Sequence, residues 1–250
     1  MSITIKTEDQ IGKMRKAGKL LAEVEALVAK TAAPGVTTAY LDKLAEDYIL
    51  SHGATPSFKG YGGFPGTLCT SINEEVIHGI PSNRVLNEGD ILSIDVGCIL
   101  NGYHADMART YAIGQISAEA KKLIEVTEQS FFEGITFAKE GNHLNDIGSA
   151  IQKYVEKNGF SVVRAYVGHG IGRKMHEPPE VPNFKTLGRG IRLQKGMTLA
   201  IEPMVNMGSY DVRVLKDGWT VVTKDGKYAA HYENTILITD GEPEILTLPR

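Results

Sequence analysis

The segment from Asp90 to Ile113, DILSIDVGCILNGYHADMARTYAI, constrains the fold more than any other part of the chain. Its Asn101-Gly102 dipeptide is typical of a two-residue hairpin turn, because both positions of such a turn need positive φ. Counting outward from the turn pairs Gly97 with Asp106 and makes Asp95 a diagonal neighbour of Asp106 on the same face. The other face of the first strand is apolar and consists of Leu92, Ile94, Val96 and Cys98. We therefore predict a hairpin with one side in the core and two carboxylates on the other.

Two carboxylates held side by side against a hydrophobic core repel each other unless a cation joins them. A metal ion is the simplest cation that would do so. The alternative is that each acid belongs to an ordinary surface ion pair, and for Asp95 or Asp106 alone that alternative is preferred. Further ligands elsewhere in the chain therefore decide between the two interpretations.

Composition excludes several classes of protein. The 250 residues are 42% hydrophobic and 23% charged with a net charge of −3, which is ordinary for a globular protein and gives no reason to expect nucleic acid or an anionic membrane as partner. Cys69 and Cys98 form neither a zinc-type spacing nor a disulfide framework, which suits a reducing compartment. No apolar run of about 18 residues and no signal-type segment is present. We expect a cytoplasmic protein.

Helical periodicity predicts two helices before the hairpin and two after it. The first opens with capping-box spacing at 7–10 and is stopped by Pro34-Gly35, and the second spans about 37–53. The third begins at Ser117, and the fourth runs to Gly159. The remaining stretch of note is a glycine- and aromatic-rich loop at 56–66. It lacks the GK[ST] ending that a phosphate-binding loop needs, so that interpretation is rejected.

The chain contains an internal repeat. The sequence LNEGDILSID at 86–95 matches LQKGMTLAIE at 193–202, and the helix pattern of 35–53 returns at 141–159. The offset of about 107 residues is too long for a solenoid array. It indicates two α+β halves, approximately 7–113 and 114–241, related by a pseudo-twofold axis.

The repeat doubles the number of carboxylates in the predicted site. Glu202 falls at the position of Asp95, and Glu233 in HYE corresponds to Asp106 in HAD, with a longer second hairpin that contains Trp219. Four acids in one cleft would raise their own pKa values unless cations neutralised them. Two divalent ions would do this, and oxygen ligands with an imidazole suit Mn, Fe, Co or Zn. Two such ions can share a bridging water and make it a nucleophile.

Histidines flanked by glycine and proline are the remaining candidates for chemistry. His169 lies in GHGIG, His176 in KMHEPP and His78 in VIHGIP. A lone histidine is more often a hydrogen-bonded structural residue than a functional one, but the flanking glycine and proline keep both interpretations open for each of these three. His104 and His231 each precede a predicted ligand by two positions, which favours hydrogen bonding to that ligand.

Together, the motifs VIHGIP, SIDVG, HADMART, GHGIG-x-x-MHEPP, IEPM and YENTILIT occur in an order and spacing that resemble those of type I methionine aminopeptidases. The resemblance covers nearly the whole chain. It implies an α+β pita-bread fold, in which a central antiparallel β-sheet is flanked by helices, as a single catalytic domain over residues 1–250. The activity that the resemblance implies is that of a dinuclear metallo-exopeptidase, which removes the initiator methionine from new proteins.

The resemblance implies a role for each motif residue. The metal ligands would be Asp95, Asp106, His169, Glu202 and Glu233. The catalytic residues would be His78, His176 and Glu202. The methionine pocket would map onto Tyr61, Phe64, Cys69 and Trp219, with Phe58 and Met175 nearby and His78 and His176 also contacting substrate. Many relatives have cysteine at the Phe58 position and phenylalanine at the Met175 position, so the pocket stays apolar but changes shape.

The implied reaction is attack of a metal-bridged hydroxide on the first peptide carbonyl, with preference for a small second residue. The cofactors would be two divalent ions (Co, Mn, Fe or Zn), and the partners would be N-terminal methionine peptides and, transiently, the ribosome, for a monomeric enzyme. One alternative is a Xaa-Pro aminopeptidase or prolidase of the same fold. Another is a binding protein of this fold without catalysis, although such a protein would be expected to lack ligands that are all present here.

Overall fold

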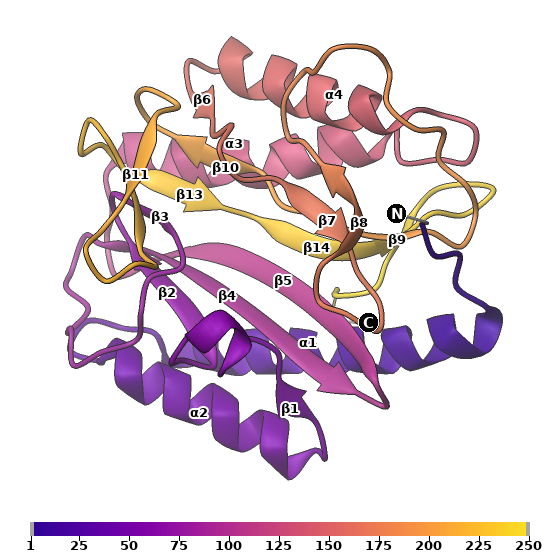
Figure 1. Ribbon diagram of the computed structural model, residues 1–250. Coiled ribbons are helices and arrows are strands. Elements are labelled where there is room, and N and C mark those ends of the chain that lie inside the picture. The colour runs from indigo at the N-terminus through magenta and orange to yellow at the C-terminus, as the bar shows by residue number, and fades with distance from the viewer. Residues whose placement is uncertain (1–2, 249–250) are drawn as a thin grey trace.

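A computed structural model describes residues 3–248 of the chain (Figure 1). The helices are α1 (Glu8–Thr31), α2 (Thr38–Ser51), α3 (Ala118–Ile135) and α4 (Leu144–Lys157), with a short 3₁₀ turn η1 (Tyr61–Gly63). The strands of the first half are β1 (Thr55–Pro56), β2 (Leu68–Ile72), β3 (Glu75–Ile77), β4 (Ile91–Leu100) and β5 (Tyr103–Ala112). The later strands are β6 (Ser161–Val162), β7 (Gly168–Gly170), β8 (Glu177–Val181), β9 (Thr198–Ile201), β10 (Met204–Asn206), β11 (Val212–Val214), β12 (Val221–Thr223), β13 (Ala229–His231), β14 (Glu233–Leu237) and β15 (Glu244–Ile245).

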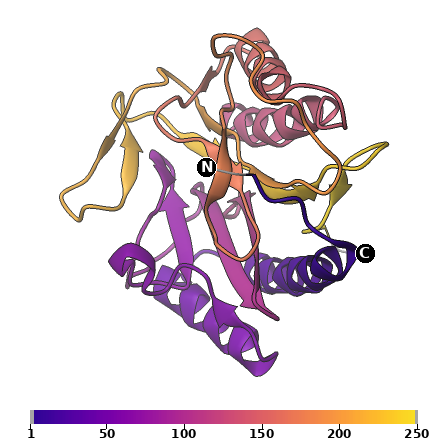
Figure 2. The ribbon, with the colours of Figure 1, turned by 45° about the vertical axis from the view of Figure 1, so that its right-hand side comes forward.

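A nine-stranded antiparallel sheet forms the centre of the molecule. Its main order is β1-β4-β5-β14-β9-β7-β8, with β2 pairing with β4 and β15 pairing with β14. Strands of the first half and of the second half meet where β5 pairs with β14. Two small three-stranded sheets, β13-β10-β6 and β11-β12-β3, lie beside it. Figures 1 and 2 show α1 and α2 covering one side of this assembly and α3 and α4 covering the other.

The predicted hairpin is present in the predicted register. Leu100 pairs with Tyr103 around the turn and Gly97 pairs with Asp106. The turn residues Asn101 and Gly102 both have positive φ, at 54° and 77°. Such conformations suit asparagine and glycine, so the dipeptide itself sets the register of both strands.

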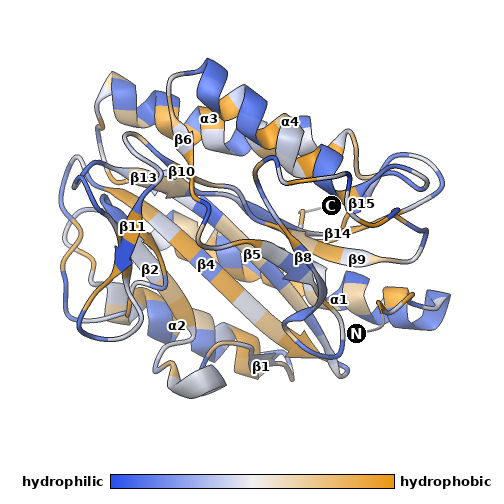
Figure 3. Cartoon of the chain, turned by 45° about the horizontal axis from the view of Figure 1, so that its top comes forward, coloured by the Kyte–Doolittle hydropathy of each residue, from blue (hydrophilic) through white to orange (hydrophobic). Residues whose placement is uncertain are grey.

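The apolar face of β4 packs against α1, as the alternation of residues requires. Leu92, Ile94, Val96 and Cys98 are fully buried in a core that also contains residues of α1 and α2. Helix α1 begins with the predicted capping box, in which Thr7 accepts from the Gln10 amide and Gln10 accepts from the Thr7 amide. Figure 3 shows hydrophobic and hydrophilic residues alternating along the helices and a hydrophobic run along β4. Burial of this face holds the carboxylate face of the hairpin away from α1.

The second half has its own core beneath α3 and α4. Buried residues of these helices pack with Val162, Leu199, Ile201 and Ile236 of the strands below them. Ser117 caps α3 as predicted, through its hydroxyl and the Ala120 amide. Among the described residues, none of the helices is both long and apolar enough to cross a membrane.

The second hairpin is longer and more divided than the first. Strands β9 and β14 pair with each other, β10 pairs with β13, and β11 pairs with β12 at the far end. Trp219 lies in the turn between β11 and β12. Strand β12 also pairs with β3, so this end of the second hairpin is joined to the first half near His78. The extra residues therefore build a wall beside the sheet.

Two glycines of α1 provide a test of how closely this helix packs. A Cβ at Gly18 would lie 2.2 Å from the backbone oxygen of Leu246, whereas a Cβ at Gly12 meets nothing within 4 Å. We expect Gly18→Ala to lower the free energy of unfolding by about 1–3 kcal/mol, because backbone must move. We expect Gly12→Ala in the same helix to raise it by about 0.5–1 kcal/mol through helix propensity. Urea denaturation of both variants measures this, and equal effects would contradict the packing described.

Candidate metal centre and adjoining pocket

Four acidic side chains from both halves converge where β5 meets β14. Asp95 and Asp106 project from the hairpin, two pairs apart in register. Glu233 is the first residue of β14 and pairs with Ala108 of β5. Glu202 directly follows Ile201, whose partner Asn234 directly follows Glu233, so the two glutamates lie opposite each other. The four acids line a single cavity.

His169 of β7 faces these acids. Its Nδ1 donates to the Gly170 carbonyl at 2.9 Å, which leaves Nε2 as the acceptor nitrogen. That Nε2 lies 3.6 Å from Glu202 Oε1 and 3.9 Å from Asp106 Oδ2. Glycine on both sides is required, since a Cβ at Gly168 or Gly170 would lie 2.3 Å from a neighbouring backbone oxygen. The GHG motif thus brings an imidazole next to the carboxylates.

His231 is closer to the cluster than the sequence predicted. Donor atoms of Asp95, His231 and Glu233 lie within 4.8 Å of one another, as do those of Asp106, His169 and Glu233. His231 is 2% exposed, and within residues 3–248 neither of its ring nitrogens has a hydrogen-bond partner. Its Nε2 lies 3.8 Å from Glu233 Oε2. His104, predicted to play the matching part in the first half, is instead within hydrogen-bond distance of the Ser57 hydroxyl, at 2.9 Å.

Burial raises the pKa values of all four acids, and repulsion from neighbouring carboxylates adds to this effect for three of them. Burial raises the pKa of Asp95 to about 7. For Asp106, Glu202 and Glu233, burial and then the neighbouring carboxylates raise the pKa well above its usual range. Burial also lowers the pKa of His169 to about 4 and that of His231 to about 3, so both imidazoles are neutral. Neutral imidazoles beside destabilised carboxylates are the state in which these groups bind metal ions.

The donor atoms fit a divalent cation. Oxygens of Asp95, Asp106 and Glu233 are buried without any hydrogen-bond partner among the described residues. Two ligand atoms that each lie about 2.0–2.2 Å from one ion are at most about 4.4 Å apart. The separations of 3.6–3.9 Å seen here are too long for hydrogen bonds and lie within that limit. Oxygen-rich ligation with imidazole, rather than thiolate, completes the match.

Structural contacts behind the acids hold their backbone in place. The Arg109 guanidinium donates to the Glu233 carbonyl and to Asn234 Oδ1, and it stacks on the Tyr232 ring with 4.0 Å to the centroid. Asn183, fully buried, donates to the Glu202 carbonyl at 3.1 Å. Neither residue was singled out from the sequence, because no local motif places it behind a site on another strand.

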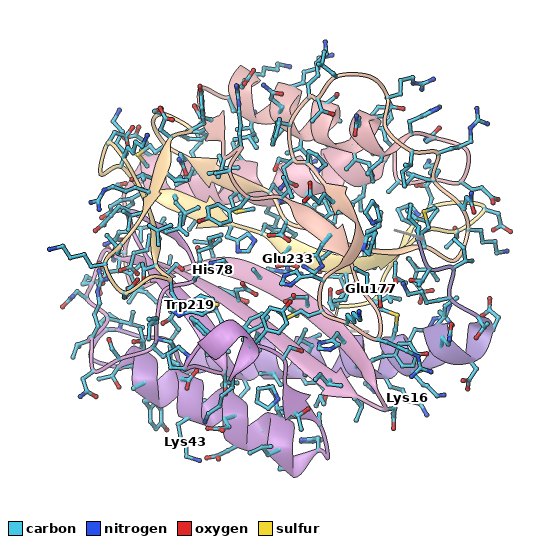
Figure 4. The ribbon with its side chains drawn as sticks, viewed as in Figure 1. Lys16, Lys43, His78, Glu177, Trp219 and Glu233 are labelled. Atoms are coloured by element: carbon cyan, nitrogen blue, oxygen red, sulfur yellow. The ribbon has the colours of Figure 1, made fainter. Side chains whose placement is uncertain are left out.

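An aromatic pocket opens beside the carboxylates. The cavity has a volume of about 190 Å³. All predicted pocket residues line it: Phe58, Tyr61, Phe64, Cys69, His78, Met175, His176 and Trp219. Phe58, Phe64, Cys69 and Met175 form a small apolar cluster, and the Phe64 and Trp219 rings meet edge to face at 5.2 Å. Figure 4 shows His78 and Trp219 lying near each other and Glu233 farther along the same side of the hairpin.

Two histidines stand between the pocket and the carboxylates. The His78 backbone has a φ of 59°, an uncommon value for a residue other than glycine, and its ring meets Tyr166 and Trp219 edge-on. His176 Nδ1 lies 2.8 Å from the Tyr61 hydroxyl, and its ring lies 4.3 Å from that of His169. Both rings therefore line the cavity that also contains the four acids.

Three cavity residues were not predicted. Ile77, Tyr166 and Val167 also line it. Ile77 directly precedes His78, and Tyr166-Val167 directly precede the GHG motif. Their position next to the glycine-flanked histidines could have identified them in the sequence. They were missed because only polar residues were considered as candidates there.

A buried set of carboxylates and imidazoles beside an apolar pocket is the arrangement of a metal-dependent hydrolase. The chain belongs to metallopeptidase family M24, whose family profile matches residues 12–240. It is therefore an enzyme of a family that uses divalent metal, as the sequence predicted. The number and identity of the ions are separate questions.

The relatives agree over the full chain. A methionine aminopeptidase from Clostridium perfringens is 61% identical over 246 residues, covering 98% of this chain and 99% of that protein. The crystal structure of methionine aminopeptidase from Rickettsia prowazekii is 46% identical with a TM-score of 0.97, covering 99% of this chain and 100% of that one. A prolidase from Pyrococcus horikoshii, 22% identical with a TM-score of 0.79, covers 98% of this chain and 64% of its own and shares the fold alone. The predicted pita-bread fold is confirmed.

Replacing one acid tests whether repulsion among the four carboxylates lowers the free energy of unfolding. A carboxyl group with a raised pKa in the folded state binds more protons there than in the unfolded state, so it costs stability as pH rises above about 4. In metal-free protein at pH 8, we expect Asp106→Asn to raise the free energy of unfolding by about 1–2 kcal/mol. The stabilisation that wild type gains from added metal should be lost.

Urea denaturation in chelator, repeated with a divalent metal, measures both effects. Asp47→Asn, on the exposed face of α2 and paired with Lys43, is the matched control and should change neither. A metal-free Asp106→Asn protein less stable than wild type would contradict the electrostatic interpretation.

Proposed function

We propose that this enzyme removes the N-terminal methionine from newly made proteins. The observation that supports this most strongly is the apolar pocket of Phe58, Phe64, Cys69 and Met175 placed directly beside the buried acids. An unbranched, polarisable methionine side chain suits such a pocket, because its sulfur makes favourable contacts with aromatic rings. With methionine in the pocket, the first peptide carbonyl falls next to the carboxylates.

The metal centre proposed here would hold two divalent cations. Its ligands would be Asp95, Asp106, His169, Glu202 and Glu233. Two overlapping groups of donor atoms that share Glu233 support this proposal. Mn, Fe, Co and Zn all suit these ligands. When bound, such ions polarise a carbonyl and lower the pKa of a nearby water.

The surrounding side chains position the substrate and move protons. Glu202, at the edge of the cluster, would act as general base toward the attacking water and return the proton to the leaving amine. If the Tyr61 hydroxyl donates to His176 Nδ1, the proton of that ring sits on Nε2. His176 Nε2 would then donate to the oxyanion as charge develops. His78 would donate to the backbone beyond the scissile bond.

The specificity proposed for this pocket is methionine first and a small second residue. Phe58 and Met175 are both within 8% exposure and contribute apolar surface to the pocket. Both side chains belong to the same buried apolar cluster, which supports a pocket for an unbranched apolar side chain.

A Xaa-Pro enzyme is the second candidate, since prolidases share this fold. It is not preferred because the aromatic pocket suits an unbranched thioether. The non-catalytic alternative is not preferred either, since every acid of the cluster is present. We further propose that residues 1–250, of which residues 1–2 and 249–250 lie outside the described part, act as one catalytic domain. A monomeric state, transient ribosome contact and a cytoplasmic location stay predictions.

A two-substrate assay tests the proposed function. We expect release of methionine from Met-Ala-Ser and at least about a hundredfold lower turnover of a Xaa-Pro peptide, since the two place different groups in the pocket. Exhaustive chelation should abolish activity, and Mn, Co or Fe should restore it. Turnover that survives metal removal, or a preference for Xaa-Pro, would refute the proposal. Elemental analysis of protein purified without added metal identifies the ion.

Replacing His176 tests its role toward the oxyanion. We expect His176→Ala to lower kcat by about 10²–10³-fold with little change in KM, because the lost hydrogen bond forms mainly in the transition state. Metal content should be unchanged. Steady-state kinetics with Met-Ala-Ser measure this, and His52→Ala on the exposed end of α2 is the control. A raised KM with unchanged kcat would mean that His176 binds substrate only.

A further inference from the structure

The loop between β7 and β8, residues 171–176, carries two cavity residues, Met175 and His176, yet forms no helix or strand. Its internal ties are few. The Gly172 amide donates to the Lys174 carbonyl at 3.1 Å, and the Gly172 carbonyl accepts from the His104 amide at 2.8 Å. The ring of His176 has the Tyr61 hydroxyl as its hydrogen-bond partner among the described residues. The Ile171 amide and carbonyl both bond to Thr198 and hold the start of the loop, so Lys174 to His176 depend on contacts from other segments.

Glu177, which directly follows His176, supplies such contacts. Its Oε1 accepts from the Lys174 amide at 3.1 Å, which closes the turn that contains His176. Its Oε2 accepts from Lys6 Nζ at 2.8 Å and from the Thr4 hydroxyl at 2.7 Å. Burial alone would raise the pKa of Glu177, but the bonds from Lys6 and Thr4 hold it below its usual value. The carboxylate is thus ionised and fully occupied.

The N-terminal strap, defined here as residues 3–6, reaches this loop from far away in the sequence. Figures 1 and 2 show the segment before α1 passing beside the strands that carry the loop, and Figure 4 labels Glu177 near it. The Lys6 amide donates to the Gly196 carbonyl at 2.8 Å, which fixes the strap to the turn before β9. A Cβ at Gly172 would lie 2.7 Å from both Lys6 Cε and Glu177 Oε1. Strap and loop are therefore in direct contact.

The ion pair between Lys6 and Glu177 is buried, with side-chain exposures of 5% and 9%. Burying two charges costs desolvation that the pair roughly offsets, so such a pair is weak evidence for a stabilising role. What a buried, hydrogen-bonded pair does supply is a defined geometry. Here that geometry is imposed on the residue next to His176.

We propose that Lys6 and Thr4 are positioning residues for catalysis. They hold the Glu177 carboxylate, and through it the turn from Lys174 to Glu177, so that His176 faces the substrate carbonyl. The proposal rests on the role of His176 in the proposed aminopeptidase reaction. It adds the N-terminal strap to the active site, at a position that no motif connects to it.

Substitution of Lys6 tests the proposal. Lys6→Met keeps an unbranched chain and removes the ammonium group. We expect kcat for Met-Ala-Ser to fall about tenfold, with KM within about threefold and metal content unchanged, since displaced catalytic groups lose rate rather than binding. Lys6→Arg should recover most of the loss. Thr4→Val removes the hydroxyl that donates to Glu177 and accepts from Lys6 but keeps the ion pair. It should give a smaller loss in the same direction and remains informative if Lys6→Met folds poorly.

A double-mutant cycle separates positioning from general destabilisation. In a His176→Ala background, Lys6→Met should have almost no further effect on kcat, because the group it positions is gone. Lys13→Met, which breaks an exposed ion pair with Asp9 on α1, is the matched control and should leave kcat unchanged in both backgrounds. The same fold-loss from Lys6→Met with and without His176, or no loss with His176 present, would overturn the proposal.

A readout independent of turnover distinguishes this failure from failure of the proposed function. The imidazole ¹⁵N resonances of His176, assigned by comparison with His176→Ala, should shift in Lys6→Met protein, whereas those of His52 should not. Unshifted His176 resonances would refute positioning by Lys6, whatever peptide the wild-type enzyme cleaves.

Discussion

Repulsion among four buried carboxylates is the interaction on which the rest of this structure depends. Asp95, Asp106, Glu202 and Glu233 lie in one cavity. Burial raises the pKa values of all four, and neighbouring carboxylates raise those of Asp106, Glu202 and Glu233 further. Such a cluster opposes folding by itself, so the remainder of the chain must hold it against that force. The apolar face of β4 packed on α1 does so on one side, and the Arg109 and Asn183 contacts do so behind the second-half acids. A divalent cation bound among these acids would turn the same repulsion into binding energy.

Structural features that depend on residues close together in the chain could be predicted from the sequence. The Asn101-Gly102 turn set the register of the first hairpin, and the capping residues Thr7 and Ser117 set two helix starts, all as the structure has them. The internal repeat was enough to bring Glu202 and Glu233 to the same cavity as Asp95 and Asp106. These features depend on neighbours or on repetition, which a single sequence displays.

Contacts between segments that lie far apart in the chain could not be predicted from the sequence. Nothing near His231 distinguishes it from His104, yet one lies among the acids and the other beside the Ser57 hydroxyl. The reason is the fold around each residue. Ser57 directly follows β1, which pairs with β4, whereas no side chain in the described part of the chain hydrogen-bonds to the His231 ring. Arg109, Asn183 and Lys6 were missed for the same reason, since each acts on a residue more than ten positions away. Sequence periodicity carries no information about such pairs.

The two halves repeat each other only approximately. They differ in the register of their acid pairs and in the length of their hairpins, and the longer hairpin helps to form the pocket. In the first hairpin the acids are diagonal, because Gly97 rather than Asp95 pairs with Asp106. In the second, Glu202 and Glu233 are opposite each other, so the pseudo-twofold axis relates unequal pairs. The first hairpin closes in a tight turn and offers only a flat face. The second continues past its acids to Trp219, whose ring meets Phe64 of the first half. The first half thus contributes the carboxylate face of its hairpin. The second half contributes Trp219, which encloses the space beside that face and makes it a pocket for a side chain.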